Sequence, residues 1–390
     1  MKYLSYLSLI ALFSFTACNN SIQKDKPKDH KQTAEDISKD KYQNHPKIII
    51  GIFSGEGAGA VSVIETIEAL KIDPEIEAFA ISPYDIISGK LNKTDAIIFP
   101  GGSGSKQLNS LGKTGKQKVI NYIKNGGGAI GICAGAYMMC QTEGYPSLKI
   151  GDVKHLDRPH YNRGRGLIEF KLNDEGLKIF PEFKDQPQFI QYYDGPIMAP
   201  LNQEKSFKSV AVYVTDIHPN EGDPVGLTPG KLFMYHQNYG KGKIFAIGGH
   251  AESTPGIRFM IPRMARWVTG NKLVSYDKKW IHPDKNHKAI LFDKNLIKTE
   301  KQLFWQLFES DSNKQIAAMD SLYAIRSRPA VRWNKGLLRD SNPEVRAQAS
   351  NLLIKAEYTD ALKDIKASYK VETDPEAKKA LKKAIDFLQY

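Results

Sequence analysis

Apolar and polar positions alternate along the first two thirds of the chain in a regular way. Short segments that are apolar throughout are separated by stretches in which apolar residues recur at helical spacing. Strands that are apolar on both faces and joined by helices predict a parallel sheet covered on both sides. The predicted strands are 48–53, 76–81, 95–99, 129–132, 233–237 and 243–247, and the predicted helices are 61–70, 83–91, 115–125 and 255–269.

Residues 144–228 follow a different pattern, with alternating polarity, more aromatic residues and polar turns. This pattern predicts antiparallel strands at one edge of the sheet, which would form one wall of a cleft. Tyr192, Tyr193 and Asp194 would then face a pocket, although burial of the tyrosines in the core is an equally good interpretation.

The segment around Cys133 predicts a sharp turn between a buried strand and a helix. Gly131 and Gly135 lie two residues to either side, where such a turn leaves no room for side chains. The sulfur would be exposed at the carboxyl end of the sheet and beside a helix N-terminus, which favours a thiolate. A buried cysteine beside a packing glycine is the alternative.

Two further elements lie at predicted strand ends. His250 and Glu252 follow the strand 243–247 and are two residues apart, so the histidine could act as a base that the glutamate orients. The glycine-rich turn after residue 99 could aim the N–H groups of Gly102 or Ser103 at an oxyanion, together with the N–H of Ala134.

With these pieces the chain resembles the class I glutamine amidotransferase-like superfamily, and within it the domain found at the N-terminus of some biotin–protein ligases. The matching segments are 99–102, 123–137, 164–170, 192–196 and 249–252. The resemblance covers residues 47–270. It implies a flavodoxin-like parallel sheet with helices on both faces, and it implies that Cys133 is the nucleophile, His250 the base and Glu252 the residue that orients it.

The chain departs from that superfamily in two respects. Glutaminases of the superfamily carry Gln four residues after the cysteine, where this chain has Tyr137. Neither a synthetase domain nor a biotin-ligase catalytic domain follows. The resemblance therefore implies a fold and a triad, but neither glutamine hydrolysis nor biotin transfer.

The glycine-rich segment 55–60 fits a G-x-G-x-x-A pattern after the first strand, so a dinucleotide site has to be considered. No convincing acidic residue ends the second strand. We expect this turn to line the cleft instead, with Glu56 close enough to Cys133 to influence the thiol.

The N-terminus has the features of a bacterial lipoprotein signal. A basic start and an apolar run too short to span a bilayer end in small residues before Cys18, which would carry the lipid. An ordinary secretory signal is the alternative. Residues 19–46 are polar and predict a flexible tether, so the folded part would face the periplasm from a membrane of the cell envelope.

Charge and cysteine usage narrow the classes of function. The 390 residues include 55 Lys and Arg against 43 Asp and Glu, for a net charge of +12. The lysines are spread along the tether and the C-terminal part rather than clustered with aromatic residues, so nucleic-acid binding is not expected. The histidines lack the spacing of metal ligands, and we expect neither a metal nor a cofactor.

The C-terminal part is helical and weakly repetitive. Polar helix-start signals at 311–315, 340–346 and 372–378 recur about every 30 residues, and each precedes an apolar helical stretch. The pattern resembles HEAT-type helical pairs, which stack and often bind protein partners; a plain helical bundle is the alternative. The expected division is 1–17 signal, 18–46 lipidated cysteine and tether, 47–272 amidotransferase-like domain, 273–298 connector and 299–390 helical domain.

Two functions are consistent with these features. The first is a thiol hydrolase that cleaves a small or peptide amide through an acyl-enzyme. The second is a binding module that keeps the triad unused and recruits a partner through its helices. The intact Cys, His and Glu favour the first, and Tyr137 favours the second.

Overall fold

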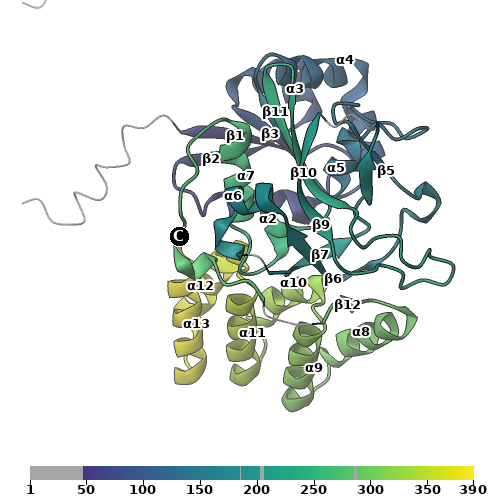
Figure 1. The fold of residues 1–390 in the computed structure, drawn as a ribbon. Helices are drawn as coiled ribbons and strands as arrows, with labels where there is room; N and C mark the ends of the chain where they lie inside the picture. The colour runs from purple at the N-terminus through teal and green to yellow at the C-terminus, as the bar shows by residue number, and fades with distance from the viewer. Residues whose placement is uncertain (1–46, 185, 203–205, 285–287) are drawn as a thin grey trace, which may run out of the picture. The chain divides into compact units, whose positions relative to one another are not determined.

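The computed structural model of the protein describes residues 47–390 except 185, 203–205 and 285–287. The expected signal, the tether and Cys18 lie outside the described residues. The described chain forms a mixed α/β part followed by a C-terminal helical part (Figure 1). Among these residues, none of the helices has the length and apolar character that crossing a bilayer requires.

One half of the sheet is parallel and carries the predicted βα alternation. Its strands lie in the order β2-β1-β3-β4-β11, each hydrogen-bonded to the next in parallel. They are β1 (Ile48–Phe53), β2 (Ile76–Ile81), β3 (Ala96–Phe99), β4 (Gly128–Ile132) and β11 (Gly242–Ile247). All five fall on the expected apolar segments.

The other half is antiparallel and continues from β11 through β10, β9 and β6 to β12, with β7 paired to β6 and β8 paired to β10 and β5. This is the edge that the alternating segment 144–228 predicted. The strands are β5 (Val153–His155), β6 (Arg165–Leu172), β7 (Gln188–Tyr193), β8 (Met198–Pro200), β9 (Phe207–Tyr213), β10 (Leu232–Tyr239) and β12 (Ile290–Leu291).

Side chains of the parallel strands alternate between two apolar cores. In β4, Ile130 and Ile132 pack into one core and Ala129 into the other. Helices α2 (Ala60–Leu70) and α7 (Met260–Val268) contribute to the first core, and α3 (Pro83–Ile87), α4 (Gly104–Lys124) and α5 (Ala134–Met139) to the second. The sheet is therefore covered by helices on both faces, which explains why its strands are apolar throughout.

Helix α4 begins earlier than expected. The apolar spacing predicted a helix from residue 115, whereas α4 starts at Gly104, directly after the glycine-rich turn. Gly112 interrupts it with a φ of 61°, a conformation that glycine adopts without strain. This break separates a first polar segment, which the hydrophobic pattern could not reveal, from the expected amphipathic one.

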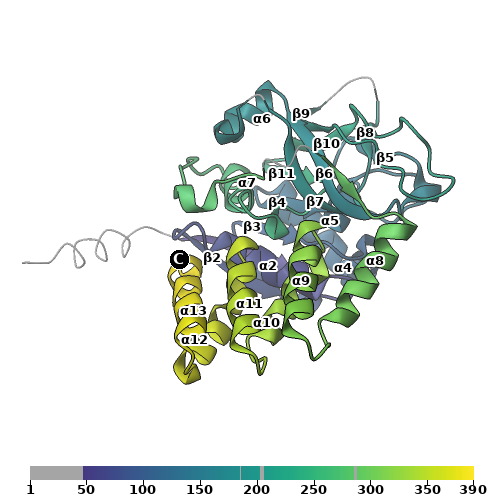
Figure 2. The ribbon, with the colours of Figure 1, turned by 90° about the horizontal axis from the view of Figure 1, so that it is seen from below.

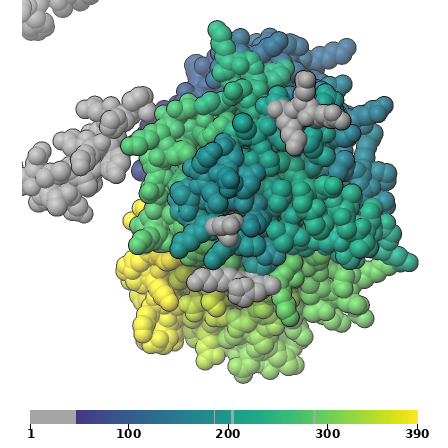
Figure 3. All heavy atoms as spheres, viewed as in Figure 1, coloured from purple at the N-terminus to yellow at the C-terminus, as the bar shows by residue number. Residues whose placement is uncertain are grey.

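The C-terminal helices have an apolar core of their own, formed by residues between Leu307 and Leu388. The short helix α6 (Asp174–Ile179) lies in the α/β part. The C-terminal helices are α8 (Lys294–Gln306), α9 (Ser312–Ala324), α10 (Arg328–Leu337), α11 (Pro343–Lys355), α12 (Leu362–Val371) and α13 (Pro375–Leu388). Figures 1 and 2 show them side by side along one end of the α/β part, near α2. In the space-filling view the two parts abut along that end (Figure 3).

Candidate active site

Cys133 lies at a strained turn between β4 and α5. Only 5% of the residue is exposed, so the expected exposure of its sulfur is wrong, although the residue lines a cavity. The backbone of Cys133 has φ 51° and ψ −102°, which is costly for a residue with a side chain, and its N–H donates to the carbonyl oxygen of Ile247 (2.9 Å). A Cβ atom added at Gly135 would lie 2.0 Å from the carbonyl oxygen of Phe99. The small residues around the cysteine are therefore required by the close approach of α5 to β3, as the sequence predicted.

His250 and Glu252 follow β11, on the strand beside β4. The imidazole Nδ1 and the Glu252 Oε1 are 2.8 Å apart, and both side chains are buried. The backbone of His250 is fixed from both sides, because its N–H donates to Gln191 O and its carbonyl accepts from the Thr254 hydroxyl. The structure thus holds the two residues in the orientation that a base and its orienting carboxylate need.

The surroundings favour a protonated imidazole. Burial and the positive charge of Arg328 oppose protonation, but the charge of Glu252 and the neighbouring Cys133 sulfur outweigh them and raise the pKa of His250 to about 9. Burial alone would raise the pKa of Glu252. The charge of His250 and its hydrogen bond to the carboxylate more than offset burial, so the pKa of Glu252 is lowered.

A serine that the sequence did not single out connects three elements of the site. The Ser62 hydroxyl, on α2, donates to Glu252 Oε1 (2.8 Å) and accepts from the N–H of Gly101 (3.0 Å). It therefore ties the orienting carboxylate to the glycine-rich turn. A small polar residue in an amphipathic helix carries no signal that could have identified it.

A second unexpected residue comes from the C-terminal helices. Arg328, the first residue of α10, places a guanidinium nitrogen 2.7 Å from Glu65 Oε2 and 3.6 Å from Glu252 Oε1. Burial lowers the pKa of Arg328, but Glu65 and Glu252 reverse the effect and raise it, so the side chain stays charged. The helical part therefore places a cation beside Glu252.

Two of the three expected oxyanion donors are available. Neither the Gly102 N–H nor the Ala134 N–H donates a hydrogen bond within the described part of the chain. The N–H of Ser103, in contrast, donates to Gly57 O (2.8 Å), because the turns at 57–59 and 101–103 pair as short antiparallel segments. Gly102 and Ala134 remain as donors, and the Ser103 N–H is engaged elsewhere.

Most of the expected residues line one cavity of about 600 Å³, which we call the thiol cavity. The predicted residues on its wall are Cys133, His250, Gly102, Ser103, Ala134, Tyr137, Tyr193 and Asp194. Tyr192 is fully buried instead, and its hydroxyl donates to Gly195 O. Glu56 is exposed and does not line the cavity. The alternation of side chains along β7 explains why Tyr193 faces the cavity and Tyr192 the core.

Aromatic and charged side chains also line the thiol cavity. Tyr137 packs against the rings of Tyr145 and His155, and its buried hydroxyl has no hydrogen-bond partner in the described structure. Burial raises the pKa of Asp194 and lowers the pKa of His155 to about 4, so His155 is neutral near pH 7. Arg328 and Arg158 also line the cavity and add positive charge.

The remaining candidates do not add a second reactive centre. Cys140 is fully buried, and burial raises the pKa of its thiol to about 12. No group of three or more His, Cys, Asp or Glu side chains among the described residues is placed to hold a metal ion.

Comparison with known proteins identifies the family. The sequence matches the family described as biotin-protein ligase, N terminal, over residues 48–278, which is more than half of the chain. The chain belongs to this family. The match contains β1 to β11 and all three residues of the expected triad, whereas Arg328 lies outside it.

The solved structures that match are distant in sequence. They include ThuA-like proteins from Bacteroides uniformis (15% identity, TM-score 0.41, 58% of this chain and 93% of that one) and from Parabacteroides merdae (13%, 0.42, 60% and 95%). A β-galactosidase from Bacillus circulans matches at 11% identity and a TM-score of 0.37, over 63% of this chain and 35% of its own. No curated protein matches the sequence of this member of the biotin–protein ligase N-terminal family.

Proposed function

We propose that this protein is a thiol-dependent hydrolase that cleaves amide bonds through an acyl-enzyme formed on Cys133. One observation carries the proposal: Cys133, Gly102, Ala134 and His250 line one cavity, and Glu252 holds His250 from behind by a 2.8 Å contact. A nucleophile, an oriented base and oxyanion donors around a common space are the elements that acyl transfer needs.

The reaction would proceed in two halves. His250, whose raised pKa makes it a strong base, takes the thiol proton on Nε2 to form an imidazolium–thiolate pair, and Cys133 Sγ then forms a bond to the carbonyl carbon of the substrate. The oxyanion is stabilised by the Gly102 and Ala134 N–H groups until the C–N bond breaks and His250 gives its proton to the leaving amine. Water, deprotonated by His250, then cleaves the thioester and releases the acid.

A second candidate function is a binding module with an unused triad. The observation that favours it is the hydrogen bond from Cys133 Sγ to the backbone carbonyl of Tyr193 (3.1 Å). A carbonyl acceptor favours the neutral thiol over the thiolate, and the thiol must leave this acceptor before His250 can take the proton. Tyr137, in the position where related glutaminases carry Gln, also supports this candidate.

We also propose a more specific fold for each part of the chain. The strand order β2-β1-β3-β4-β11 supports a flavodoxin-like, class I glutamine amidotransferase-like domain over residues 47–272. Helices α9, α11 and α13 each begin after a side-chain cap, from Asp311, Asn342 and Asp374, at the recurring positions of the sequence. These starts support HEAT-like pairs over 299–390, joined by a connector at 273–298, as a surface for a protein partner.

Attachment to the cell envelope is also proposed on the sequence. Cleavage before Cys18 and lipidation of that residue would anchor the protein to a membrane, with residues 18–46 as a tether and the folded part facing the periplasm. A soluble amide, peptide or small molecule, would then reach the thiol cavity from that compartment.

The test is the rate at which iodoacetamide alkylates each cysteine, followed by peptide mapping in the intact protein and in His250→Ala. We expect Cys133 to react at pH 7 and its rate to fall about tenfold in the variant, because the thiolate is the nucleophile and His250 stabilises it. Cys140 is a matched internal control, since it does not line the thiol cavity and burial raises the pKa of its thiol to about 12, which should keep it unreactive in both proteins. Equal rates for Cys133 in the two proteins would refute the hydrolase and leave the binding module.

A further inference from the structure

Exposed aromatic side chains gather at one place on the C-terminal helices. Trp305, in the last turn of α8, is 69% exposed, and Phe308, just after that helix, is 63% exposed. Trp333, on α10, is 46% exposed, and the centre of its ring lies 5.4 Å from that of Phe308. No other tryptophan or phenylalanine among the described residues is exposed. Single exposed apolar residues are ordinary, whereas a cluster of them marks an interaction surface.

Helix α8 has a different character on each of its three sides. On one side, Leu303 and Leu307 pack into the core of the C-terminal helices. A second side is polar and uncharged, with Asn295, Thr299, Gln302 and Gln306. The third side, which we call the outer stripe, combines basic and apolar residues at positions that share one face of the helix; they are Lys294, Ile297, Lys298, Lys301, Phe304, Trp305 and Phe308.

The outer stripe belongs to the end helix of a row. Helix α8 packs against α9 and stands at one end of the C-terminal helices (Figures 1 and 2). The end helix of a stacked helical array normally presents a polar face to water. The aromatic side chains of the outer stripe depart from that rule, so covering them with an apolar environment would be favourable.

The lysines of the outer stripe leave it positively charged. Lys298 and Lys301 are exposed, and neither forms an ion pair with any residue that the structure describes. Lys294 pairs with Glu221, but both side chains are almost fully exposed, where such a pair contributes little. Glu300 is the one acid within α8, and it is buried rather than exposed on the stripe.

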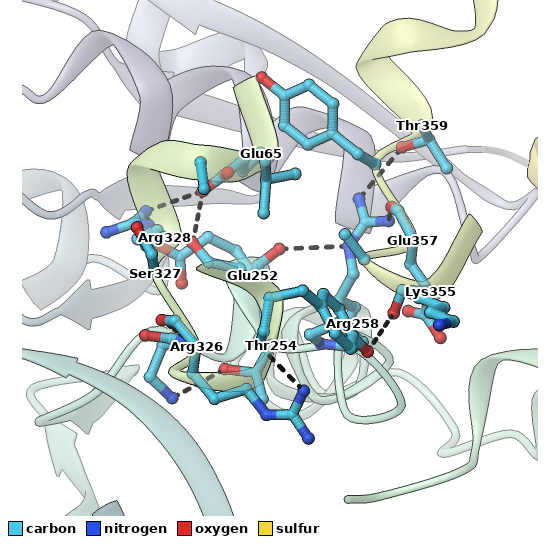
Figure 4. A pocket seen from close by; sticks show the side chains of 18 of the residues that line it. Glu65, Glu252, Thr254, Arg258, Arg326, Ser327, Arg328, Lys355, Glu357 and Thr359 are labelled. Carbon is cyan, nitrogen blue, oxygen red and sulfur yellow. Dashed lines mark hydrogen bonds and ion pairs between the residues drawn. The ribbon is translucent and has the colours of Figure 1, made fainter. Parts of the chain in front are cut away.

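Buried contacts fix α8 and α10 against the α/β part. Glu300 pairs with Arg165 of β6 and accepts from the Ser327 hydroxyl (2.6 Å). Figure 4 shows Ser327 and Arg328 on the wall of a second cavity, of about 360 Å³, which lies behind the triad and is also lined by Glu252. The outer stripe therefore has a defined position relative to the thiol cavity.

We propose that the outer stripe docks on an anionic lipid membrane, with Trp305 and Phe308 at the level of the headgroups and the lysines against lipid phosphates. Tryptophan is favoured at the boundary between a bilayer and water, because its ring is apolar and its N–H is polar. Lysines beside inserted aromatic rings keep their ammonium groups in the headgroup region and add attraction to an anionic surface.

The composition of the outer stripe favours lipid over two other occupants. Protein interfaces are depleted in lysine and enriched in arginine, whereas every cation of the stripe is a lysine. In a symmetric contact between two copies of the chain, the lysines of one copy would face those of the other and repel them.

Docking also agrees with the lipid proposed at Cys18. Residues 19–46 can span at most roughly 90 Å, which lets the outer stripe reach the membrane that holds the anchor. The contact goes beyond the proposed hydrolase and does not involve Cys133. It is therefore tested without the lipid and without a substrate.

The experiment is co-sedimentation with lipid vesicles of the expected mature chain, residues 18–390, carrying Cys18→Ser so that no lipid is attached. We expect at least tenfold tighter binding to vesicles of equal parts phosphatidylglycerol and phosphatidylcholine than to phosphatidylcholine alone. Trp305→Ser should weaken binding to the anionic vesicles at least tenfold, because the inserted ring is lost. The double variant Lys298→Gln with Lys301→Gln should do the same by removing two positive charges.

Matched controls change the same kinds of residue elsewhere. Tyr84→Ser removes an exposed aromatic ring from α3, and Lys366→Gln with Lys370→Gln removes two exposed lysines from α12. We expect less than a twofold change in vesicle binding from either control. Every variant alters exposed residues, so an unchanged melting temperature is expected and confirms that each protein is folded.

Three outcomes would overturn the proposal. Equal losses in the stripe variants and the controls would mean that overall charge, and not the outer stripe, binds the vesicles. A dimer in sedimentation velocity that Trp305→Ser converts to a monomer would indicate contact between copies. A monomer that binds no anionic vesicle would indicate a protein partner. The alkylation rate of Cys133 should be the same in Trp305→Ser, so failure of docking is distinguishable from failure of the hydrolase.

Discussion

The α/β part and the C-terminal helical part both contribute to the site around Cys133, His250 and Glu252, but they do so by different routes. In the α/β part, Cys133 and His250 are adjacent because β4 and β11 are paired in parallel and both residues follow the carboxyl ends of their strands. In the helical part, Arg328 reaches Glu252 because the first turn of α10 packs against α2 and the segment after β11. Sheet topology alone places Cys133 and His250. Arg328 is placed by the docking of the helical part, which has a separate apolar core.

This difference has a consequence for how each part tolerates change. The α/β part brings backbones into contact at glycines around the site, so its geometry is fixed by close packing. The helical part meets the site through charged side chains, so its influence is electrostatic. The following experiments separate these two kinds of control.

The largest effect on stability is expected from adding one methyl group at Gly135, in the turn that follows Cys133. In Gly135→Ala the new Cβ would lie 2.0 Å from Phe99 O, and the backbone would have to move, which we expect to cost about 3 kcal/mol or more. The matched control is Gly336→Ala in α10, where a Cβ would meet nothing within 4 Å. Removing a helical glycine there should stabilise by about 0.5–1 kcal/mol. Urea unfolding measures both, and a neutral Gly135→Ala would contradict the close approach of α5 to β3.

A smaller loss of stability is expected when the charge of Arg328 is removed. Arg328→Gln removes the charge that pairs with Glu65 and approaches Glu252, and we expect the free energy of unfolding to fall by about 2 kcal/mol because these carboxylates lose a partner. Because the Arg328 charge opposes protonation of His250, the pKa of His250 should rise in the variant. NMR titration of the His250 ring measures this shift, with the exposed Arg332→Gln on the same helix as control. An unchanged His250 pKa in Arg328→Gln would mean that the two parts are not coupled.

The smallest effect is expected from a change of pH. The α/β part should lose stability at alkaline pH and the helical part at acid pH. The folded pKa of His250, about 9, lies above the unfolded value of 6.5, so its contribution is fully present below pH 6.5 and is lost as pH rises through 9. In the helical part, hydrogen bonds from Arg346 outweigh burial and lower the pKa of Glu372 to about 2. That contribution is present above pH 4.5 and is lost as pH falls through 2.

The pH dependence of the unfolding free energy tests this contrast. His250→Gln should flatten the alkaline limb and leave the acid limb, and Glu372→Gln should do the reverse. If either variant changes both limbs equally, the two parts do not titrate independently.

Much of the α/β part could be predicted because its signals are local. The apolar segments at 48–53 and 76–81 coincide with strands, and the elbow glycines are required by contacts that the sequence pattern implies. The start of α4 was missed because its first turns are polar. The Ser103 N–H and Glu56 were misplaced because the pairing of two glycine-rich turns, which directs them away from the cavity, has no signature in either turn alone.

The sequence by itself determined the strand and helix alternation, the strained turn at Cys133 and the pairing of His250 with a carboxylate two residues away. These features depend on side-chain periodicity, glycine spacing and neighbours along the chain. Only the tertiary structure decided that Ser62 and Arg328 complete the environment of Glu252, that Tyr193 rather than Tyr192 faces the thiol, and that a second cavity lies behind the triad. These depend on how separately folded surfaces dock, and such contacts join residues up to hundreds of positions apart, which no local pattern encodes.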